Sequence, residues 1–376
     1  MKKTILCFIT GSGIGGVATA FTSFAHALEE KGYNVKVLLL YEKEIAETSI
    51  PSKYVCGSAF KWPITNKVIR FIAQIINLIT HRYFYFKLAK KVDHDIFIAY
   101  QGMGCSHWYQ YTKKPSVIFF HQRLPFNPSG GIITSLLRNL HSYNFQRFTE
   151  RVAISDVIAK SWQARYRFKN LPQTILNLVN VKNVLELSLE SQCEMTKSGR
   201  PQLISVARLS FEKGILRLLE VAKRVLLEGG SFDLYLVGDG PLMGDVLKFV
   251  KANSLEDTIH ILGKKKNPYP YMKAADLLVL PSYEEGLGLV LWESLIVNTP
   301  VLATRCGGAE EALRGGEWGT LVENSEDGLY KGIEYAINNL DTLTQSVDSN
   351  NIREELENMN VEMCNRLMNL LYNLIK

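Results

Sequence analysis

Short apolar segments alternate with longer amphipathic ones along almost the whole chain, and this pattern limits the fold more than any other feature. Between the first two apolar segments, Val17–Lys31 has helical spacing. Apolar strands without polar alternation, separated by helices, are typical of parallel sheets covered on both faces. In the first half the strand-like segments are Thr4–Thr10, Asn34–Leu40, Asp95–Tyr100, Ser116–Phe120 and Arg151–Ile154.

The pattern repeats in the second half, after a polar stretch, Ser188–Pro201, that has no clear period and indicates a linker. The length of 376 residues also suits two domains. We therefore predict two doubly wound, Rossmann-like α/β domains, at residues 1–190 and 200–358, facing across a cleft at the carboxyl ends of both sheets. We expect residues 359–376 to form a helix that packs back on the first domain. The second-half strand segments are Gln202–Ala207, Phe232–Val237, Thr258–Leu262, Asp276–Leu280, Pro300–Ala303 and Gly319–Val322.

The composition indicates a globular protein without a membrane span. Hydrophobic residues make up 47% and charged residues 21% of the chain, and no apolar run is long enough to cross a bilayer. The segment Met1–Thr10 has the features of a signal peptide's first half, but it ends in a glycine loop, which favours a buried first strand. The 6 cysteines are scattered without the spacing of a metal or redox site. We expect a cytoplasmic protein with reduced thiols, no metal and no nucleic-acid partner.

The net charge of +6 hides an asymmetry between the two halves. Residues 1–195 contain 24 Lys and Arg against 12 Asp and Glu, whereas the remainder contains 19 against 25. A basic half beside an acidic half is compatible with an anionic surface or substrate as partner, and equally with an ordinary basic surface.

Two segments of the first half are both apolar and basic. Asn66–Lys91 carries isoleucines at helical spacing among lysines and arginines, and Ile132–Arg151 repeats this more weakly. Such helices either pack on a core with a solvated basic face or lie in the headgroup region of an anionic membrane. With the charge asymmetry, they predict peripheral contact at the inner face of the cell membrane.

The segment Asp276–Leu295 is the most informative for function. An apolar strand ends at Pro281-Ser282, glycines interrupt the following loop, and helical periodicity resumes at Leu289. Glycines let backbone N–H groups approach a ligand closely, and a helix N-terminus favours a diphosphate. Glu285 on the loop is placed for sugar hydroxyls, and Glu293 in the helix can accept hydrogen bonds from a ribose diol. The spacing predicts a nucleotide-sugar site.

A second motif supplies positive charge. Arg208 follows a predicted strand, and Lys213 precedes the next helix in the run from Ser205 to Gly214. Two cations over one pocket can neutralise a pyrophosphate leaving group, which is elsewhere the work of a divalent metal.

Three further elements complete the predicted site. The loop at Gly238 is expected to wall the nucleotide pocket, and Glu311 is either a site carboxylate or a cap of its own helix. His121 ends an apolar strand, so it is either a satisfied core histidine or a contact of the sugar.

The loop Gly11–Gly16 satisfies G-x-G-x-x-G and opens two possibilities. It is compatible with a nicotinamide or flavin site, in which case Glu42 would be the acidic partner. Alternatively, Gly15 and Gly16 direct backbone N–H groups toward donor phosphates. The nucleotide apparatus of the second half favours the latter.

These motifs together resemble the retaining family 4 glycosyltransferases, which have the two-domain GT-B fold. Glu285-x7-Glu293 within EEGLGLVLWE, the preceding Lys266–Ser282, the Arg208/Lys213 pair, Val237–Leu242 and Cys306–Glu311 carry the resemblance. It is strong for residues 202–322 and moderate for the first half.

The resemblance implies roles for individual residues. Arg208, Lys213, Glu285 and His121 would be catalytic, and Glu311 and Asn177 would join the site. Residues facing the donor would be Gly15, Gly16, Gly238, Lys266, Asn267, Gly286, Leu287, Gly288, Leu289, Val290 and Glu293.

The predicted reaction is metal-independent transfer, with retention, of a hexose from a UDP- or GDP-sugar to a hydroxyl of a glycan, with no bound cofactor. By resemblance, the acceptor is a lipid-linked glycan of the O-antigen or capsule type. The alternatives are a dinucleotide-dependent oxidoreductase and a non-catalytic partner subunit of the same fold.

Overall fold

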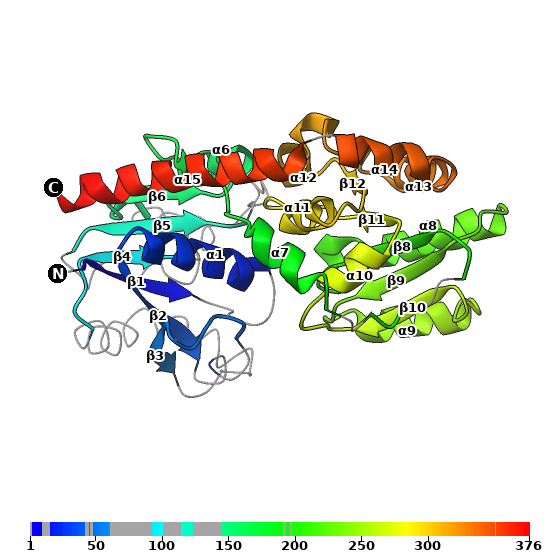
Figure 1. The fold of residues 1–376 in the computed structure, drawn as a ribbon, viewed down its shortest axis with the longest axis horizontal. Coiled ribbons are helices and arrows are strands. Elements are labelled where there is room, and N and C mark those ends of the chain that lie inside the picture. The colour runs from blue at the N-terminus through cyan, green and yellow to red at the C-terminus, as the bar shows by residue number, and fades with distance from the viewer. Residues whose placement is uncertain are drawn as a thin grey trace, which may run out of the picture. The chain divides into compact units, whose positions relative to one another are not determined.

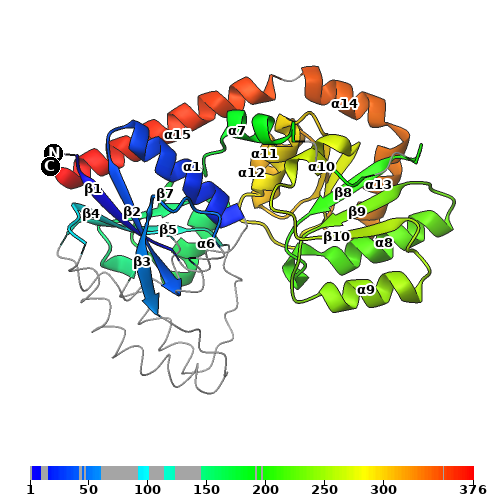
Figure 2. The same cartoon turned by 60° about the horizontal axis from the view of Figure 1, so that its bottom comes forward.

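The computed structural model describes residues 2–9, 16–41, 45, 48–60, 92–100, 114–122, 145–190, 193–195, 198–349 and 351–376. The chain divides into two compact units. Unit 1 consists of Met1–Leu178 and Glu362–Lys376, and unit 2 of Val179–Val361. Figures 1 and 2 label their helices and strands.

Unit 1 is built on a seven-stranded sheet in the order β3-β2-β1-β4-β5-β6-β7. Every neighbouring pair in it is parallel. The strands are β1 (Thr4–Ile9), β2 (Asn34–Tyr41), β3 (Val55–Phe60), β4 (Ile96–Ala99), β5 (Ser116–Phe120), β6 (Glu150–Ala153) and β7 (Gln173–Thr174). The helices are α1 (Gly16–Glu30), α6 (Asp156–Tyr166) and the C-terminal part of α15 (Ile352–Ile375).

Consecutive residues of β5 show how both faces of this sheet are covered, because successive strand side chains point to opposite faces. Phe119 contacts Phe24 of α1, and Met363 and Leu367 of α15 lie in the same apolar group. On the other face Phe120 stacks on Trp162 of α6, with ring centroids 3.9 Å apart. The all-apolar strands thus lie between two helical layers.

Unit 2 is built on a six-stranded parallel sheet in the order β10-β9-β8-β11-β12-β13. The strands are β8 (Gln202–Val206), β9 (Asp233–Val237), β10 (Ile259–Gly263), β11 (Leu277–Leu280), β12 (Val301–Thr304) and β13 (Thr320–Val322). The helices are α7 (Val181–Leu187), α8 (Ile215–Leu227), α9 (Met243–Ala252), α10 (Tyr269–Ala274), α11 (Leu289–Ile296), α12 (Gly308–Ala312), α13 (Glu326–Asn338) and α14 (Leu340–Ser349), with short 3-10 helices η2 (Phe211–Lys213) and η3 (Arg314–Gly316).

The helices of unit 2 form two layers on its sheet (Figure 2). One core cluster joins α8, α9 and α13 to the strands through residues such as Leu218, Val246 and Leu329. The short helices α7, α10, α11 and α12 contact one another in the second layer. The predicted class, two doubly wound parallel α/β domains, is confirmed. In each sheet the strand order reverses beside its first strand, and such a reversal is where α/β sheets bind ligands.

Candidate functional site

The predicted polar residues of unit 2 come from loops at the carboxyl ends of two neighbouring strands. β8 and β11 pair directly where the strand order reverses. The loop after β8 carries Arg208 and Lys213, and the loop after β11 carries Glu285. Since parallel strands end at the same edge, both loops start side by side.

The centre of the site is an ion pair between these loops. Lys213 Nζ lies 2.6 Å from Glu285 Oε1, and Ser282 Oγ donates a hydrogen bond of 2.8 Å to the same oxygen. Glu285 is 8% exposed, whereas a quarter of the Lys213 side chain remains accessible. The backbone of Glu285 also bridges to Gly307, which follows β12. Because an ammonium has three donors, Lys213 can bind an anionic ligand while still contacting Glu285.

Gly214 allows the two loops to approach this closely. A Cβ built there would lie 2.0 Å from the Pro281 carbonyl oxygen, and the backbone has φ of +65°. A side chain would be excluded by contact and strained by conformation. The Glu212 carbonyl then accepts a hydrogen bond of 2.9 Å from the Tyr283 N–H, which joins η2 to the loop of Glu285.

Three side chains that were not predicted as site residues stabilise the contact between the loops of Lys213 and Glu285. The Arg217 guanidinium lies 3.9 Å from the Tyr283 ring centroid and donates to the Pro281 carbonyl and to Asn324 Oδ1. Phe211, which is largely exposed, stacks on the same Tyr283 ring with centroids 5.2 Å apart. Burial lowers the pKa of Arg217. In the sequence, the one indication of this cluster is that Arg217 interrupts the apolar face of α8.

Arg208 stands apart from the ion pair. It lies beyond the end of β8 and is exposed, and its side chain pairs with no carboxylate of the described residues. Its charge is therefore available to a ligand at this edge of the sheet.

The N-terminus of α11 is adjacent in sequence to Glu285. Gly288 precedes the helix with φ of +77°, and Leu289 and Val290 form its first turn. The first N–H groups of a helix have no partner within it. In the loop before it, Gly286 is half-buried and Leu287 is buried. Backbone donors and a favourable helix dipole are thus presented beside Glu285.

Glu293 lies inside α11 in a much drier environment. It is 9% exposed, and Tyr269 of α10 donates a hydrogen bond of 3.2 Å to its Oε1. Burial raises the pKa of Glu293 to about 7, and the Tyr269 hydrogen bond acts in the opposite direction. Burial also raises the pKa of Tyr269, so its hydroxyl stays protonated.

The loop after β9 packs backbone to backbone on the loop that carries Arg208. A Cβ at Gly238 would lie 1.8 Å from the Ala207 carbonyl oxygen, and one at Gly240 would lie 2.3 Å from that of Leu209. The Leu209 N–H also donates to the Asp239 carbonyl at 3.0 Å. The predicted Gly238 loop therefore borders the loop of Arg208.

Lys266 and Asn267 precede α10 and differ in their surroundings. Lys266 is exposed. The Asn267 amide donates to the Leu187 carbonyl at 2.8 Å and to Glu190 at 2.9 Å, and its oxygen accepts from the Tyr269 N–H. Its side chain therefore ties the end of α7 to α10.

The two glutamates at α12 have separate positions. Glu310 accepts a hydrogen bond of 3.2 Å from the Gly307 N–H and pairs with Arg305 at 3.3 Å. Glu310 therefore caps this helix, a role that the sequence also allowed for Glu311. Glu311 is half-buried on the same helix.

In unit 1, His121 follows β5 and is buried among aromatic rings. Its ring centroid lies 4.5 Å from that of Tyr100 and 6.3 Å from that of Phe119. Burial lowers the pKa of His121 to about 3, against a smaller opposing effect of the Phe119 backbone. Neither ring nitrogen has a well-aligned hydrogen bond to a described residue. His121 is therefore a neutral imidazole at physiological pH.

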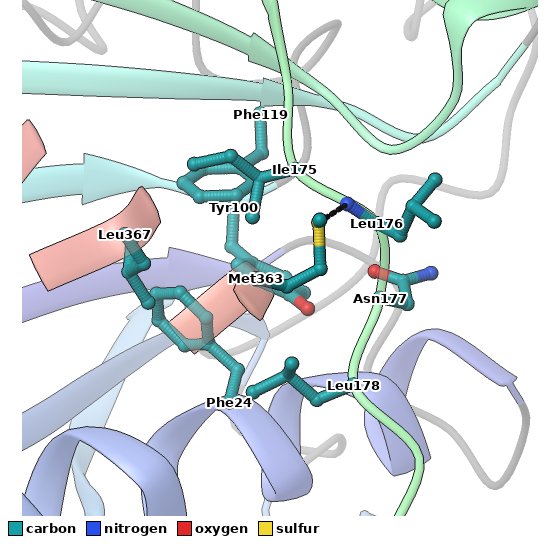
Figure 3. Close-up of a pocket in the computed structure, with 9 residues that line it drawn as sticks. All are labelled: Phe24, Tyr100, Phe119, Ile175, Leu176, Asn177, Leu178, Met363 and Leu367. Carbon is teal, nitrogen blue, oxygen red and sulfur yellow. Dashed lines mark hydrogen bonds between the residues drawn. The ribbon is translucent and has the colours of Figure 1, made fainter. Parts of the chain in front are cut away.

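Asn177 lies near His121's neighbours at the edge of a small apolar pocket, shown in Figure 3. Phe24, Tyr100 and Met363 line this pocket, and the Leu176 N–H contacts Met363 Sδ at 3.3 Å. The Asn177 side chain points away from these apolar groups (Figure 3). The pocket is a gap in the packing of α15 on unit 1.

Several predicted features lie wholly or largely outside the described residues. These are Gly11–Gly15 with Glu42, the segment Asn66–Lys91 and most of Ile132–Arg151. Gly16 is described as the first residue of α1. Within the described ranges, no three His, Cys, Asp or Glu side chains are grouped to hold a metal ion, and no helix is long and apolar enough to span a membrane. The five described cysteines are free thiols.

Part of the chain matches a known protein family. Residues 190–353, which contain the whole Lys213–Glu285 site, match the family described as Glycosyl transferases group 1. This segment is therefore similar to that family of transferases.

The similar sequences are partial matches. An uncharacterized glycosyltransferase from Haemophilus influenzae is 25% identical over 206 residues, covering 54% of this chain and 56% of that protein. A diphospho-undecaprenol 4-alpha-N-acetylgalactosaminyltransferase from Campylobacter jejuni is 29% identical over 164 residues, or 43% of each chain. The chain thus spans about half the length of the curated relatives it matches.

Solved structures match over the full length. A glycosyltransferase from Rickettsia africae superposes with a TM-score of 0.76 at 18% identity, covering 100% of this chain and 99% of that one. HepE from Anabaena, solved with UDP-glucose, superposes with a TM-score of 0.74 at 17% identity, covering 97% and 99%. The whole chain therefore has the GT-B fold.

Proposed function

We propose that this chain is a retaining glycosyltransferase that moves a sugar from a UDP- or GDP-sugar to a hydroxyl of a glycan. The Lys213–Glu285 pair with Ser282, at the edge shared by β8 and β11, carries the proposal. Lys213 is a partly accessible cation and Glu285 a fixed carboxylate, and the N-terminus of α11 follows on the loop of Glu285. That combination suits a ligand with a diphosphate next to a ring of hydroxyls.

The donor diphosphate would be bound by positive charge. Lys213 and Arg208 would neutralise its oxygens, and the N–H groups of Leu289 and Val290 would donate to it at the start of α11. Gly286 and Gly288 let the backbone approach, and Gly238 and Lys266 would border the nucleotide. These cations supply the stabilisation that a divalent metal gives elsewhere, which supports a metal-independent reaction.

The two glutamates would bind hydroxyls on either side of the diphosphate. Glu293 would accept hydrogen bonds from the ribose, because its carboxylate has a single hydrogen bond from the described residues. Glu285 is held rigidly by Lys213 and Ser282 and would contact the transferred sugar.

His121 of unit 1 is also a predicted member of the site. The neutral imidazole of His121, which has no well-aligned hydrogen bond to a described residue, is suited to donate one hydrogen bond to a sugar hydroxyl or accept one from it. Gly15, Gly16 and Asn177 of unit 1 and Glu311 of unit 2 stay predicted members of the site.

In the proposed step the acceptor oxygen attacks the anomeric carbon on the face from which the diphosphate leaves. The bond from that carbon to phosphate breaks, the new glycosidic bond forms, and the acceptor's proton passes to the departing phosphate oxygen. Arg208, Lys213 and the α11 N-terminus stabilise the charge that develops on the leaving group.

The acceptor we propose is a lipid-linked glycan used for bacterial cell-surface polysaccharide. The Campylobacter relative acts on a diphospho-undecaprenol substrate, and another relative, from Rhizobium meliloti, is a lipopolysaccharide core glycosyltransferase. The basic excess of residues 1–195 would then face anionic lipid from the cytoplasmic side. Liposome co-sedimentation that ignores both anionic lipid and salt would contradict this membrane contact.

The main test is transfer from labelled UDP- and GDP-sugars, with and without EDTA. We expect donor-dependent transfer or slow donor hydrolysis that survives EDTA and is abolished by Glu285→Ala. An absolute requirement for magnesium, or NAD(P)H binding with no response to sugar nucleotides, would argue against the proposal.

A further inference from the structure

Tyr269 and Glu293 form an isolated polar pair between two packed helices. Tyr269 begins α10 and is 6% exposed, and Glu293 lies within α11 and is 9% exposed. The Tyr269 hydroxyl donates to Glu293 Oε1 at 3.2 Å. Among the described residues, this is the hydrogen bond that the Glu293 side chain receives, and Oε2 receives none.

A buried carboxylate with one donor is poorly satisfied. Glu285, by comparison, receives both Lys213 Nζ and Ser282 Oγ. Buried carboxylates ordinarily accept several hydrogen bonds, because the unpaired charge is costly. The unused capacity of Glu293 fits a ligand that brings donors of its own.

Tyr269 is also the group that most affects the charge of Glu293 from its surroundings. The elements packed against α11 include α7, α10, α12, β11 and β12, and Arg353 at the start of α15 donates a hydrogen bond of 2.7 Å to the Ile296 carbonyl of α11. Burial raises the pKa of Glu293, and the Tyr269 hydrogen bond offsets part of that rise. The other titratable side chains on these elements are not among the causes of that shift; they are Lys182, Glu186, Tyr271, Lys273, Glu310, Glu311 and Arg353.

We propose that Tyr269 is a positioning residue for nucleotide binding: its hydroxyl occupies Glu293 Oε1, fixes the carboxylate plane and leaves Oε2 for the vicinal hydroxyls of a ribose. This deepens the proposed function and rests on it, since it takes Glu293 as the ribose-binding group. Loss of the Tyr269 hydroxyl lets Glu293 hold its proton to higher pH, so nucleotide binding weakens near neutrality.

The substitution Tyr269→Phe tests this, with Tyr271→Phe as the matched control. Tyr271 lies on the same helix, is 3% exposed and contacts Lys265 instead of Glu293. The affinity of each protein for UDP and for GDP is measured by calorimetry from pH 5.5 to 8.5. The probes' own phosphate ionisation is common to all proteins, so differences between variants report on the protein.

We expect wild-type affinity to rise through pH 7 and the midpoint for Tyr269→Phe to move by about one pH unit to higher pH, the size of one lost hydrogen bond to a charged group. Tyr271→Phe should keep the wild-type midpoint. An unchanged midpoint in Tyr269→Phe, or an equal change in both variants, overturns the inference.

A second measurement separates this inference from the proposed function. Carbon-13 NMR titration of the glutamate carboxyls in the free protein, with Glu293→Gln to assign the signal, follows Glu293 without nucleotide. If neither UDP nor GDP binds the wild type, the proposed function fails. The Glu293 titration then still shows whether Tyr269→Phe moves it to higher pH, and an unmoved titration refutes the Tyr269 role.

Discussion

Unit 1 and unit 2 share one winding order, yet the described ends of their strands carry different chemistry. In unit 2 the loops after β8 and β11 hold charged side chains in direct contact, such as Lys213 and Glu285. In unit 1 the end of β5 carries His121, which is surrounded by Tyr100 and Phe119. Among the described residues, the unit 2 edge thus presents paired charges, whereas the end of β5 in unit 1 presents a neutral ring.

Each unit also contains a buried ionisable group, and burial acts on both through the same physics. It disfavours the charged form, so it lowers the pKa of the base His121 to about 3 and raises that of the acid Glu293 to about 7. The pKa of His121 therefore lies below the physiological pH range, whereas the pKa of Glu293 lies within it.

The largest expected effect is the acid sensitivity that His121 gives to unit 1. Its folded pKa of about 3 lies below its ordinary value of 6.5, so its contribution is present above pH 6.5 and is lost as pH falls toward 3. The shift corresponds to ~5 kcal/mol. Urea unfolding of wild type and His121→Leu should give stability curves that run parallel above pH 7, and below that pH the wild type should lose stability relative to the variant. Parallel curves throughout would mean that His121 is not neutral in the fold.

Removing the Lys213 ammonium should nearly abolish transfer. Lys213→Ala is expected to lower kcat by on the order of 10²–10³, because one stabilising donor to the leaving group is lost. Lys248→Ala, at an exposed position of α9, is the matched control and should keep full activity. Equal losses in both variants would remove Lys213 from the site.

Glu293 should make unit 2 less stable as the pH rises. Its folded pKa of about 7 lies above its ordinary value of 4.5, so the folded state binds more protons between these values and stability falls with increasing pH. The total change is ~3 kcal/mol. Unfolding measured from pH 4.5 to 8 should show this decline in wild type and not in Glu293→Gln, a slope opposite in sign to that from His121.

The contact of Gly214 with Pro281 can be separated from its backbone conformation. Gly229 has φ of +95° with open space around its Cβ position, whereas Gly214 has φ of +65° and the Pro281 oxygen at 2.0 Å. Gly229→Ala should cost ~1–2 kcal/mol for the left-handed backbone alone. Gly214→Ala should cost more and also reduce activity. Similar unfolding free energies for both variants would show that the loops do not need this contact.

The smallest effect is expected at the Phe211–Tyr283 stack. Because Phe211 is 73% exposed, Phe211→Ala should lower stability by ~1 kcal/mol or less. Phe211→Tyr should retain the stack and the stability. Leu227→Ala removes an exposed side chain outside the junction and serves as control. No difference between Phe211→Ala and this control would leave the stack without a structural role.

The sequence predicts most of the fold because the strands and helices are set by local patterns. Eleven predicted strand segments correspond to strands within one or two residues at each end. β3 and β7 were not predicted, and both are edge strands. β3 contains Gly57, a poor strand former, and β7 has two residues, so each depends on its neighbour for its conformation.

The site is less accessible to sequence analysis, because its supporting contacts join distant segments. Motif spacing located Lys213 and Glu285, whose contact the structure shows. Arg217 and Tyr269 were not predicted as site residues, since nothing local in their helices indicates Pro281 or Glu293 as partners. For Asn267 the motif gave no sign that its amide is taken by Leu187 and Glu190.

The glycine contacts at the sheet edge also restrict how this protein can diverge. Gly214, Gly238 and Gly308 each face a carbonyl so closely that no side chain fits, which closes these positions to mutational drift. If this edge binds the donor as proposed, we expect changes in donor preference at accessible neighbours such as Phe211 and Lys266, where a substitution leaves the backbone undisturbed. We therefore expect the three glycines to stay fixed among homologues. Homologues that use different sugars should differ at the exposed positions around them.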